Sequence, residues 1–192
     1  MVDRIEIANL PIYGYGSMSF VLSLVEAAVE MTGGRVNAAD IRRILELGKQ
    51  MIQRPVVLLE GVEQAVKQLA QTHPLMLVTK GDLRHQQAKL EGSGLGEYFT
   101  SVEVVSDKNT RVYANILKRH AVQADRFLMV GNSLRSDILP VLELGGWVVY
   151  VPYHIIWSHE HAELDCAGGE RCFEIESLGE LVELVRKIES DQ

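Results

Sequence analysis

The chain has 192 residues, enough for one well-buried core and a small subdomain beside it. Apolar residues make up 47% and charged residues 23%, as in ordinary globular proteins, and a net charge of −7 argues against a nucleic-acid partner, which clustered Lys and Arg would bind. The first residues lack the layout of a signal peptide, and the most apolar early stretch, 20–29, is too short to span a bilayer. The two cysteines, Cys166 and Cys172, form no disulfide framework and are expected to be reduced, so we expect a cytoplasmic protein without a membrane partner.

The first third of the chain is predicted to be helical. Apolar residues recur at helical spacing over 19–31 and 38–53, and Asn37 is a suitable N-cap for the second of these helices. Pro55 marks the end of that helix. We expect a small helical hairpin beside a sheet domain.

From residue 75 onward, short apolar strands alternate with amphipathic helices. The predicted strands are 75–79, 102–105, 127–130, 147–151 and 172–175. The first three strands are followed by the helices 82–92, 109–120 and 134–144, and the fifth by the helix 177–189. A further helix over 61–71 leads into the first strand. This alternation indicates an α/β fold with a Rossmann-like parallel sheet flanked by helices. We predict a helical part over 1–58 and a sheet domain over 59–192.

Polar residues follow the first two strands at the points where each ends. Thr79, Lys80 and Gly81 place a hydroxyl, an ammonium group and backbone N–H groups at a strand-to-helix turn, which is suited to phosphoryl oxygens. Lys108 follows the second strand and offers another cation. Each residue alone is weak, but their order at successive strand ends predicts a phosphate site.

The third strand ends in Gly131-Asn132-Ser133, and a carboxylate, Asp137, follows five residues after Asn132. Ligands of parallel sheets bind where strands end. Amide and carboxylate oxygens suit Mg²⁺, which favours carboxylates, waters and substrate phosphate. We expect Asn132 and Asp137 to hold Mg²⁺, and we expect Thr79, Lys108, Asn132 and Asp137 to converge on one cleft.

These motifs resemble the haloacid dehalogenase-like (HAD) hydrolase superfamily. Thr79 resembles its second motif, Lys108 its third and residues 131–137 its fourth, and the helical first third resembles the remainder of a cap subdomain. The resemblance implies that Thr79 binds the transferring phosphoryl group, that Lys108 neutralises charge, and that Asp137 holds Mg²⁺ directly or through water. Asn132 stands where the family more often has Asp, so weaker Mg²⁺ binding is expected.

The family's first motif, Asp-x-Asp, has no counterpart here, because no two aspartates of the chain are separated by one residue. Asp3 is rejected as the nucleophile, since Arg4 and Glu6 do not suit a strand buried on both faces. In the family this strand lies between those bearing motifs two and four, and without it they would stand about 10 Å apart, twice the usual spacing of roughly 4.8 Å. We expect the downstream part of a longer protein, or else a true pseudoenzyme, with self-association or a collapsed sheet.

Two classes of function stay open at this point. The first is a Mg²⁺-dependent phosphatase of a small phosphorylated metabolite, present here without its nucleophile and therefore inactive. The second is a non-catalytic module that binds a phosphate ligand or a partner. Dehalogenation is a distant third, because Thr79, Lys108 and Asp137 suit a phosphoryl group with a metal.

Two further segments are given structural interpretations. Tyr13-Gly14-Tyr15-Gly16 resembles part of a glycine-rich nucleotide motif, but it follows no strand and lacks the third glycine. A hinge or simple loop packing suits it better. The loop 153–161 carries His154, His159 and His161, and we interpret it as a surface loop rather than a metal site.

Overall fold

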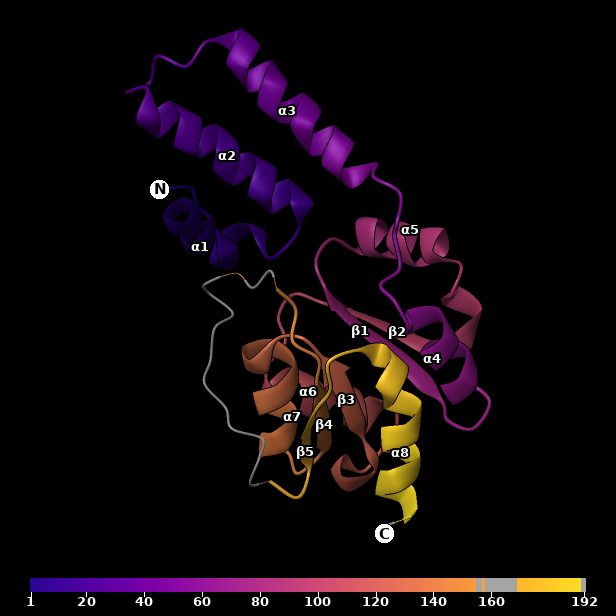
Figure 1. Cartoon of the computed structure of the whole chain (residues 1–192). Coiled ribbons are helices and arrows are strands. Elements are labelled where there is room, and N and C mark those ends of the chain that lie inside the picture. Colours follow the sequence, from indigo (N-terminus) through magenta and orange to yellow (C-terminus); the bar gives the residue numbers. More distant parts are fainter. Residues whose placement is uncertain (155–156, 158–168, 191–192) are drawn as a thin grey trace. The chain divides into compact units, whose positions relative to one another are not determined.

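The computed structural model describes residues 1–154, 157 and 169–190 (Figure 1). Its contacts divide the chain into two compact units. Unit 1 comprises Met1–Val57, Val78–Gly96 and Val104–Ser106, and unit 2 comprises Leu58–Leu77, Glu97–Glu103 and Asp107–Gln192. The domain boundary at residues 58 and 59 stays a prediction. Within the described residues, no helix combines the length and the apolar character needed to cross a membrane.

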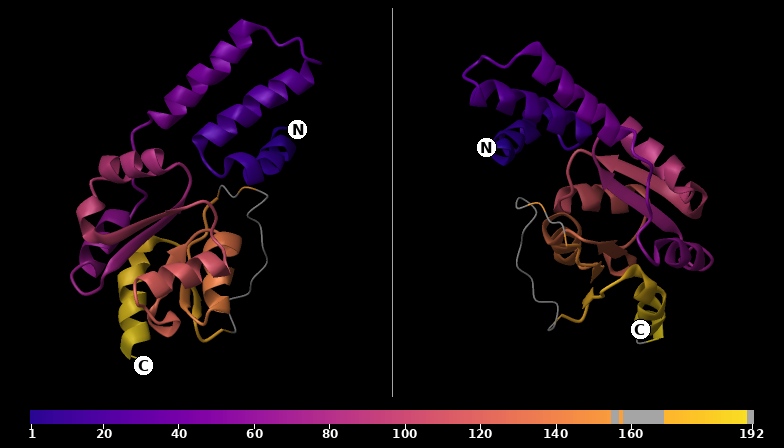
Figure 2. Two further views of the ribbon diagram at one scale, coloured as in Figure 1. Left: turned by 180° about the vertical axis from the view of Figure 1, so that it is seen from behind. Right: turned by 45° about the horizontal axis from the view of Figure 1, so that its top comes forward.

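Three helices form the first part of unit 1: α1 (Val2–Tyr13), α2 (Ser17–Met31) and α3 (Ala38–Ile52). Figure 2 shows α2 and α3 running alongside each other. The predicted N-cap of α3 is confirmed, because the Asn37 side chain accepts a hydrogen bond from the Asp40 amide at 2.9 Å. Gly48 allows α2 and α3 to pack closely, since a Cβ there would lie 2.4 Å from Cγ2 of Val21.

The seam between α1 and α2 is polar. The buried Asn9 side chain donates to Ser23 Oγ at 3.1 Å and to a Glu26 carboxylate oxygen at 2.7 Å. Arg4 binds both carboxylate oxygens of Glu30, at 2.5 and 2.6 Å. The hydrogen bonds of Asn9 compensate for the burial of its side chain and of Ser23, while the Arg4–Glu30 pair joins the two helices at the exposed surface.

Unit 1 also contains α5 (Leu83–Ser93) and the carboxyl ends of two strands, β1 (Leu75–Lys80) and β2 (Phe99–Val105). The two strands form a sheet of their own. At one end Thr100 Oγ1 donates to the Leu75 carbonyl at 2.9 Å, and at the other the Gly81 N–H donates to the Val105 carbonyl at 3.4 Å. Residue numbers therefore rise together along both strands, which makes the pair parallel.

Unit 2 is built on the sheet β3-β4-β5, formed by β3 (Leu128–Gly131), β4 (Trp147–Tyr150) and β5 (Cys172–Glu174). Both neighbouring pairs are parallel, with Met129 opposite Val148 and Val149 opposite Phe173. The helices of this unit are α4 (Val62–Leu69), α6 (Thr110–Arg119), α7 (Leu139–Glu143) and α8 (Leu181–Ser190). The parallel, helix-flanked α/β fold predicted from the sequence is confirmed.

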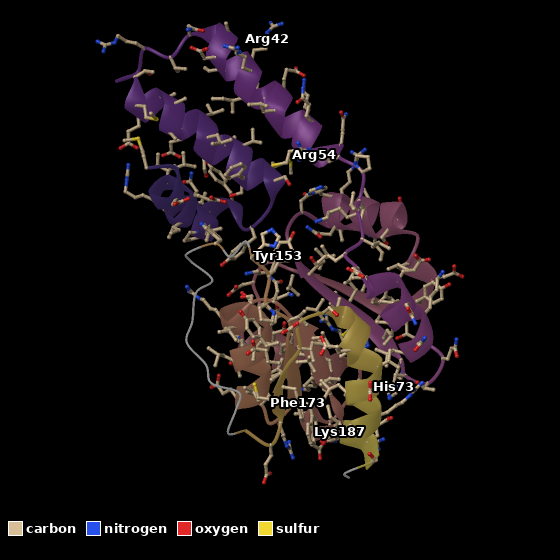
Figure 3. All side chains as sticks on the ribbon, viewed as in Figure 1. Arg42, Arg54, His73, Tyr153, Phe173 and Lys187 are labelled. Carbon is tan, nitrogen blue, oxygen red and sulfur yellow. The ribbon has the colours of Figure 1, made fainter. Side chains whose placement is uncertain are left out.

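Helices cover both faces of β4, and Figure 1 shows α8 on one side of β3–β5 and α7 on the other. Val148 and Val149 are neighbours in the strand and point to opposite faces, yet both are fully buried. On the α8 face, Val149 packs in a cluster with Leu181 and Val185. Phe173 of β5, labelled in Figure 3, stacks on the Trp147 ring with centroids 6.2 Å apart.

One edge of β3 has no neighbouring strand among the described residues, because β1 belongs to the other sheet. The carbonyls of Phe127 and Gly131 accept bonds from Trp147 and Val151 at 2.9 Å, on the side of β4. Backbone groups alternate along a strand, so those of Leu128 and Val130 face the opposite edge. Among the described residues, the strands therefore form two separate parallel sheets, and β1 is not paired with β3.

Two details differ from expectation. The predicted helix over 134–144 begins as a π-helical turn, η3 (Leu134–Ile138), before α7 starts, because the Ser133 carbonyl accepts from both Asp137 and Ile138. Cys172 is disulfide-bonded, so the expectation of reduced cysteines is wrong. Cys166, the other cysteine of the sequence, lies outside the described residues. His159 and His161, which belong to the predicted surface loop 153–161, lie outside them as well.

Candidate active site

A buried ion pair joins two of the predicted site residues in unit 2. The Lys108 ammonium lies 2.7 Å from Asp137 Oδ1, and the two side chains are 12% and 6% exposed. The second carboxylate oxygen, Oδ2, accepts the Ser133 N–H at 3.1 Å. Loss of hydration is compensated by charge-assisted contacts to both oxygens.

Local structure at the end of β3 fixes the position of Asp137. The Asp137 amide donates to the Ser133 carbonyl at 2.8 Å, while Ser133 Oγ caps the turn by accepting from the Ser136 amide at 3.0 Å. Gly131 leaves room for the carboxylate, since a Cβ there would lie 2.4 Å from Asp137 Oδ2. A residue with a side chain at position 131 would therefore collide with the Asp137 carboxylate in its observed position.

Lys108 lies between β2 and α6 in a turn built by its neighbours. Its own N–H donates to Asp107 Oδ1 at 2.8 Å, and Asn109 Nδ2 donates to Asp107 Oδ2 at 2.9 Å. Asn109 also caps α6 by accepting the Val112 amide at 3.0 Å. These bonds hold the backbone of Lys108 at the entry of a helix, from which its side chain reaches Asp137.

Tyr113 of α6 adds a group that the sequence did not predict. It is fully buried, and its hydroxyl lies 3.9 Å from Met129 Sδ. Burial raises the pKa of the Tyr113 phenol, and the nearby Asp137 charge and hydrogen bonding to Asp137 raise it further. Tyr113 therefore stays protonated beside the carboxylate. Its place five residues after Lys108 carries no recognisable motif.

The β1–α5 turn in unit 1 holds the other predicted residues. Thr79 Oγ1 donates to Gln86 Oε1 at 3.0 Å, and the Gly81 N–H makes the weak bond to Val105 described above. Asp82 caps α5, because its Oδ1 accepts from the His85 amide at 3.0 Å. Gly81 has φ +133, and a Cβ there would lie 2.8 Å from Gln86 Nε2. The Gln86 side chain thus folds over the turn.

The structure brings Lys108 and Asp137 together, and it places Thr79, Lys80 and Gly81 in one turn. The first pair belongs to unit 2 and the turn to unit 1, so the convergence of all of them on one cleft stays a prediction. Asn132 is exposed at the end of β3. Among the described residues, no group of three His, Cys, Asp or Glu side chains could hold a metal ion.

Comparison with known proteins assigns the chain to a family. Residues 4–145 match the haloacid dehalogenase-like hydrolases, and the chain belongs to this family. Human and rat N-acylneuraminate-9-phosphatases are 27% and 30% identical over 125 and 129 residues, which is 62% of this chain and 50% of each relative. The chain therefore spans about half the length of the curated relatives it matches.

Solved structures agree with this assignment. A haloacid dehalogenase-like family hydrolase from Xanthomonas campestris is 40% identical, with a TM-score of 0.89 over 99% of this chain and 76% of that chain. The putative HAD-hydrolase YfnB from Bacillus subtilis, described as bound to magnesium, shares the fold at 19% identity, with a TM-score of 0.66 over 96% of this chain and 80% of that chain.

Proposed function

We propose that this chain binds the phosphoryl group of a small phosphorylated metabolite and that its site is that of a phosphatase. The observation that carries the proposal is the buried Lys108–Asp137 pair at the ends of β2 and β3. A cation fixed at the carboxyl edge of a parallel sheet is suited to charge that develops on a phosphoryl group. The relatedness to N-acylneuraminate-9-phosphatases supports the same class of reaction.

Each residue has a defined part in this proposal. Thr79 would turn its hydroxyl from Gln86 to a phosphoryl oxygen, and the turn Lys80-Gly81 would add charge and backbone donors. Lys108 would neutralise the charge of a second phosphoryl oxygen, and its hydrogen bond to Asp137 would fix the position of its ammonium group. Phosphoryl transfer needs little beyond such positioning and charge stabilisation.

Magnesium is the cofactor we propose, with Asp137 and Asn132 as the residues that would hold it. The donor set fits in kind, because both offer oxygen atoms and waters and substrate phosphate can complete the shell. Its charge is low, however, because Lys108 already neutralises the single carboxylate. When bound, the ion would supply positive charge to the phosphoryl oxygens. We expect weak binding that strengthens when Lys108 is replaced by a neutral residue.

The 192 residues contain no Asp-x-Asp motif, and this motif provides the nucleophile in the family. We therefore propose that this polypeptide binds phosphate ligands without turning them over. A non-catalytic phosphate-binding module is the second candidate, and the pairing of Asp137 with Lys108 favours it, because the ammonium group offsets the carboxylate charge that would otherwise repel a phosphate, without a metal.

Isothermal titration with inorganic phosphate tests the binding site. We expect Thr79→Val to weaken binding about 10- to 100-fold, the effect of losing one hydrogen bond to a charged group. Lys108→Met should abolish binding, and the double variant Lys108→Met/Asp137→Asn, which removes the pair together, should do the same while keeping the fold. Lys89→Met, an exposed lysine of α5, is the control and should change nothing. Unaltered binding by both Thr79→Val and the double variant would contradict the proposal.

A further inference from the structure

The exposed apolar side chains of this protein are concentrated in residues 1–57. Of the large apolar side chains that are exposed among the described residues, all but Leu59, Leu83 and Val102 belong to this segment, which contains α1, α2 and α3 of unit 1. An amphipathic helix normally buries its apolar stripe against a neighbour, and soluble monomers rarely expose a large continuous apolar patch. The three helices therefore carry apolar surface that they do not cover themselves.

The packing of α2 on α3 determines which sides of the two helices stay open. A Cβ on Gly48 would lie 2.4 Å from Cγ2 of Val21, so these two residues mark the line of contact. Val21 lies near the start of α2 and Gly48 near the end of α3, and the two helices are therefore antiparallel. On α2, Ser23 bonds to Asn9 of α1, about 200° around the helix axis from Val21. Between these two contacts α2 has a wide sector that faces neither α1 nor α3.

Two apolar stripes lie next to each other on one side of this helix pair. The stripe of α2 lies about 60–100° around the axis from Val21 and contains Met18, Leu22 and Val29. The stripe of α3 lies within about 60° of Gly48 and contains Ile41, Leu45 and Ile52. In an antiparallel pair, residues displaced in the same rotational sense from the line of contact lie on the same side, so the six residues form one surface, the α2–α3 face. Their exposed fractions run from 37% for Ile52 to 55% for Met18, apart from the half-buried Ile41.

A shallow groove of about 400 Å³ follows α3 along this face. Its lining is apolar at Ile41 and Leu45 and basic at Arg42 and Lys49. Lys49 pairs with Glu46 at 2.8 Å, whereas Arg42, labelled in Figure 3, is exposed and has no ion pair in the part of the chain that the structure describes. The groove therefore fits an apolar helix that carries an acidic residue at the edge of its apolar stripe.

The charges of residues 1–57 match a second copy of the same segment. Residues 1–31 carry four acidic side chains and one basic side chain, a net charge of −3, whereas residues 32–57 carry five basic and two acidic side chains, a net charge of +3. The segment as a whole is neutral, and the net charge of −7 belongs to the rest of the chain. Two copies can therefore approach through this segment without net repulsion, and each presents an acidic α2 to the basic α3 of the other.

We propose that the α2–α3 face is a dimer interface, in which two copies form an antiparallel four-helix bundle about a two-fold axis parallel to the helices. Such an axis places α2 of each copy on α3 of the other and keeps every residue at its own height along the bundle. Glu26 lies five residues after Val21, and Arg42 lies six residues before Gly48. At 1.5 Å of rise per residue, Glu26 of one copy and Arg42 of the other differ by only about 1.5 Å in height, and both lie at the outer edge of the interface.

The mass of the full 192-residue chain in solution tests this proposal. Light scattering over a dilution series should give a mass that levels off at twice that of the chain, because a two-fold interface is closed. Leu45→Lys should raise the dissociation constant about 100-fold, since it places two charges in the apolar centre of the interface. Leu47→Lys is the matched control and should leave the dimer unchanged, because Leu47 is 60% exposed and lies about 100° from Gly48 in the opposite rotational sense.

Reversal of the two edge charges provides a second test, which a misfolded variant cannot pass. Glu26→Arg and Arg42→Glu should each weaken the dimer about tenfold, because each places like charges side by side at two equivalent positions. An equimolar mixture of these two variants should regain the affinity of the unaltered chain, since a mixed dimer again pairs opposite charges at both positions. Arg43→Glu makes the same change of charge on the opposite side of α3 and should have no effect.

Three results would each overturn the proposal. The first is a constant monomer mass over the whole dilution series. The second is association that Leu45→Lys leaves unaltered, which would place the contact elsewhere, such as at the edge of β3. The third is a mixture of Glu26→Arg and Arg42→Glu that associates no more tightly than either variant alone.

Discussion

Replacing Lys108 by Met should destabilise unit 2 strongly, because it leaves the Asp137 carboxylate buried without its counter-ion. The two side chains are 12% and 6% exposed and their charged atoms are 2.7 Å apart, so solvent cannot take over the role of the ammonium group. The hydrogen bonds to the carboxylate from the Ser133 N–H and from Tyr113 would remain, but neither group carries a positive charge. Removing one partner of such a pair costs about 3–5 kcal/mol, whereas removing both together costs much less. We therefore expect a coupling energy of about 2–3 kcal/mol between Lys108→Met and Asp137→Asn.

Urea unfolding followed by tryptophan fluorescence measures this effect in the right part of the chain. Both tryptophans, Trp147 and Trp157, belong to unit 2, so their emission reports on the unit that contains the pair. The two single variants and the double variant complete a cycle with the unaltered chain. Additive effects, with a coupling energy below about 0.5 kcal/mol, would refute the description of Lys108 and Asp137 as one buried unit.

Four other outcomes are expected. Gly131→Ala should lower the stability of unit 2 by about 1–3 kcal/mol in the same urea assay, because its Cβ would meet Asp137 Oδ2. Gly92→Ala in α5 of unit 1 should be neutral or slightly stabilising in urea unfolding followed by circular dichroism. Burial, and to a lesser extent the neighbouring Asp3, raises the pKa of Glu6, so the folded state binds the Glu6 proton more tightly than the unfolded state and stability falls as pH rises above 4.5. In thermal unfolding, Glu6→Gln should therefore be more stable than the unaltered chain at pH 7 and equally stable at pH 3. The 192-residue chain should not hydrolyse p-nitrophenyl phosphate with or without Mg²⁺, since losing a nucleophile removes about 10⁶-fold in rate in a well-studied hydrolase, and turnover that Asp137→Ala abolishes would contradict this. The edge of β3 should promote self-association, seen in light scattering as a mass that rises with concentration, and a constant monomer mass would exclude it.

Much of the sheet domain could be predicted because its signals are local. Apolar runs such as 127–130 and 147–151 end at polar or glycine residues, and buried parallel strands have this pattern. The cap of α3 at Asn37 was likewise readable, because a capping side chain and its partner amide are three residues apart. Patterns of this kind depend on near neighbours only.

Helix α1 was missed because its sequence contains opposing signals. Pro11 lies inside the helix, where proline normally ends one, and Asn9 is a poor helix former. Packing on α2 outweighs both, since Asn9 donates two hydrogen bonds to that helix. The π-helical turn before α7 was also unpredictable, because it results from one carbonyl, that of Ser133, accepting two amides.

The candidate site was partly predictable for the same reason. Lys108 and Asp137 were chosen as residues at strand ends, where the ligands of parallel sheets bind. They do lie together, although β2 and β3 belong to different sheets. Tyr113 and Gln86 escaped notice, because each contacts the site residues through tertiary packing that no sequence spacing reveals. The contacts of Tyr15 with Lys80 and of Ser17 with His85 join residues far apart in the chain and needed the fold to be seen.

We propose that the β1–α5 turn and the Lys108–Asp137 pair bind one and the same phosphoryl group. Titration of the isotopically labelled chain with inorganic phosphate, followed by backbone amide NMR shifts, distinguishes one shared site from two. We predict that the amides of Lys80, Gly81, Lys108 and Ser133 shift together with a single dissociation constant, and that Thr79→Val weakens the response at all four positions equally. Shifts confined to one of the two units, or separate dissociation constants for the turn and the pair, would contradict the claim.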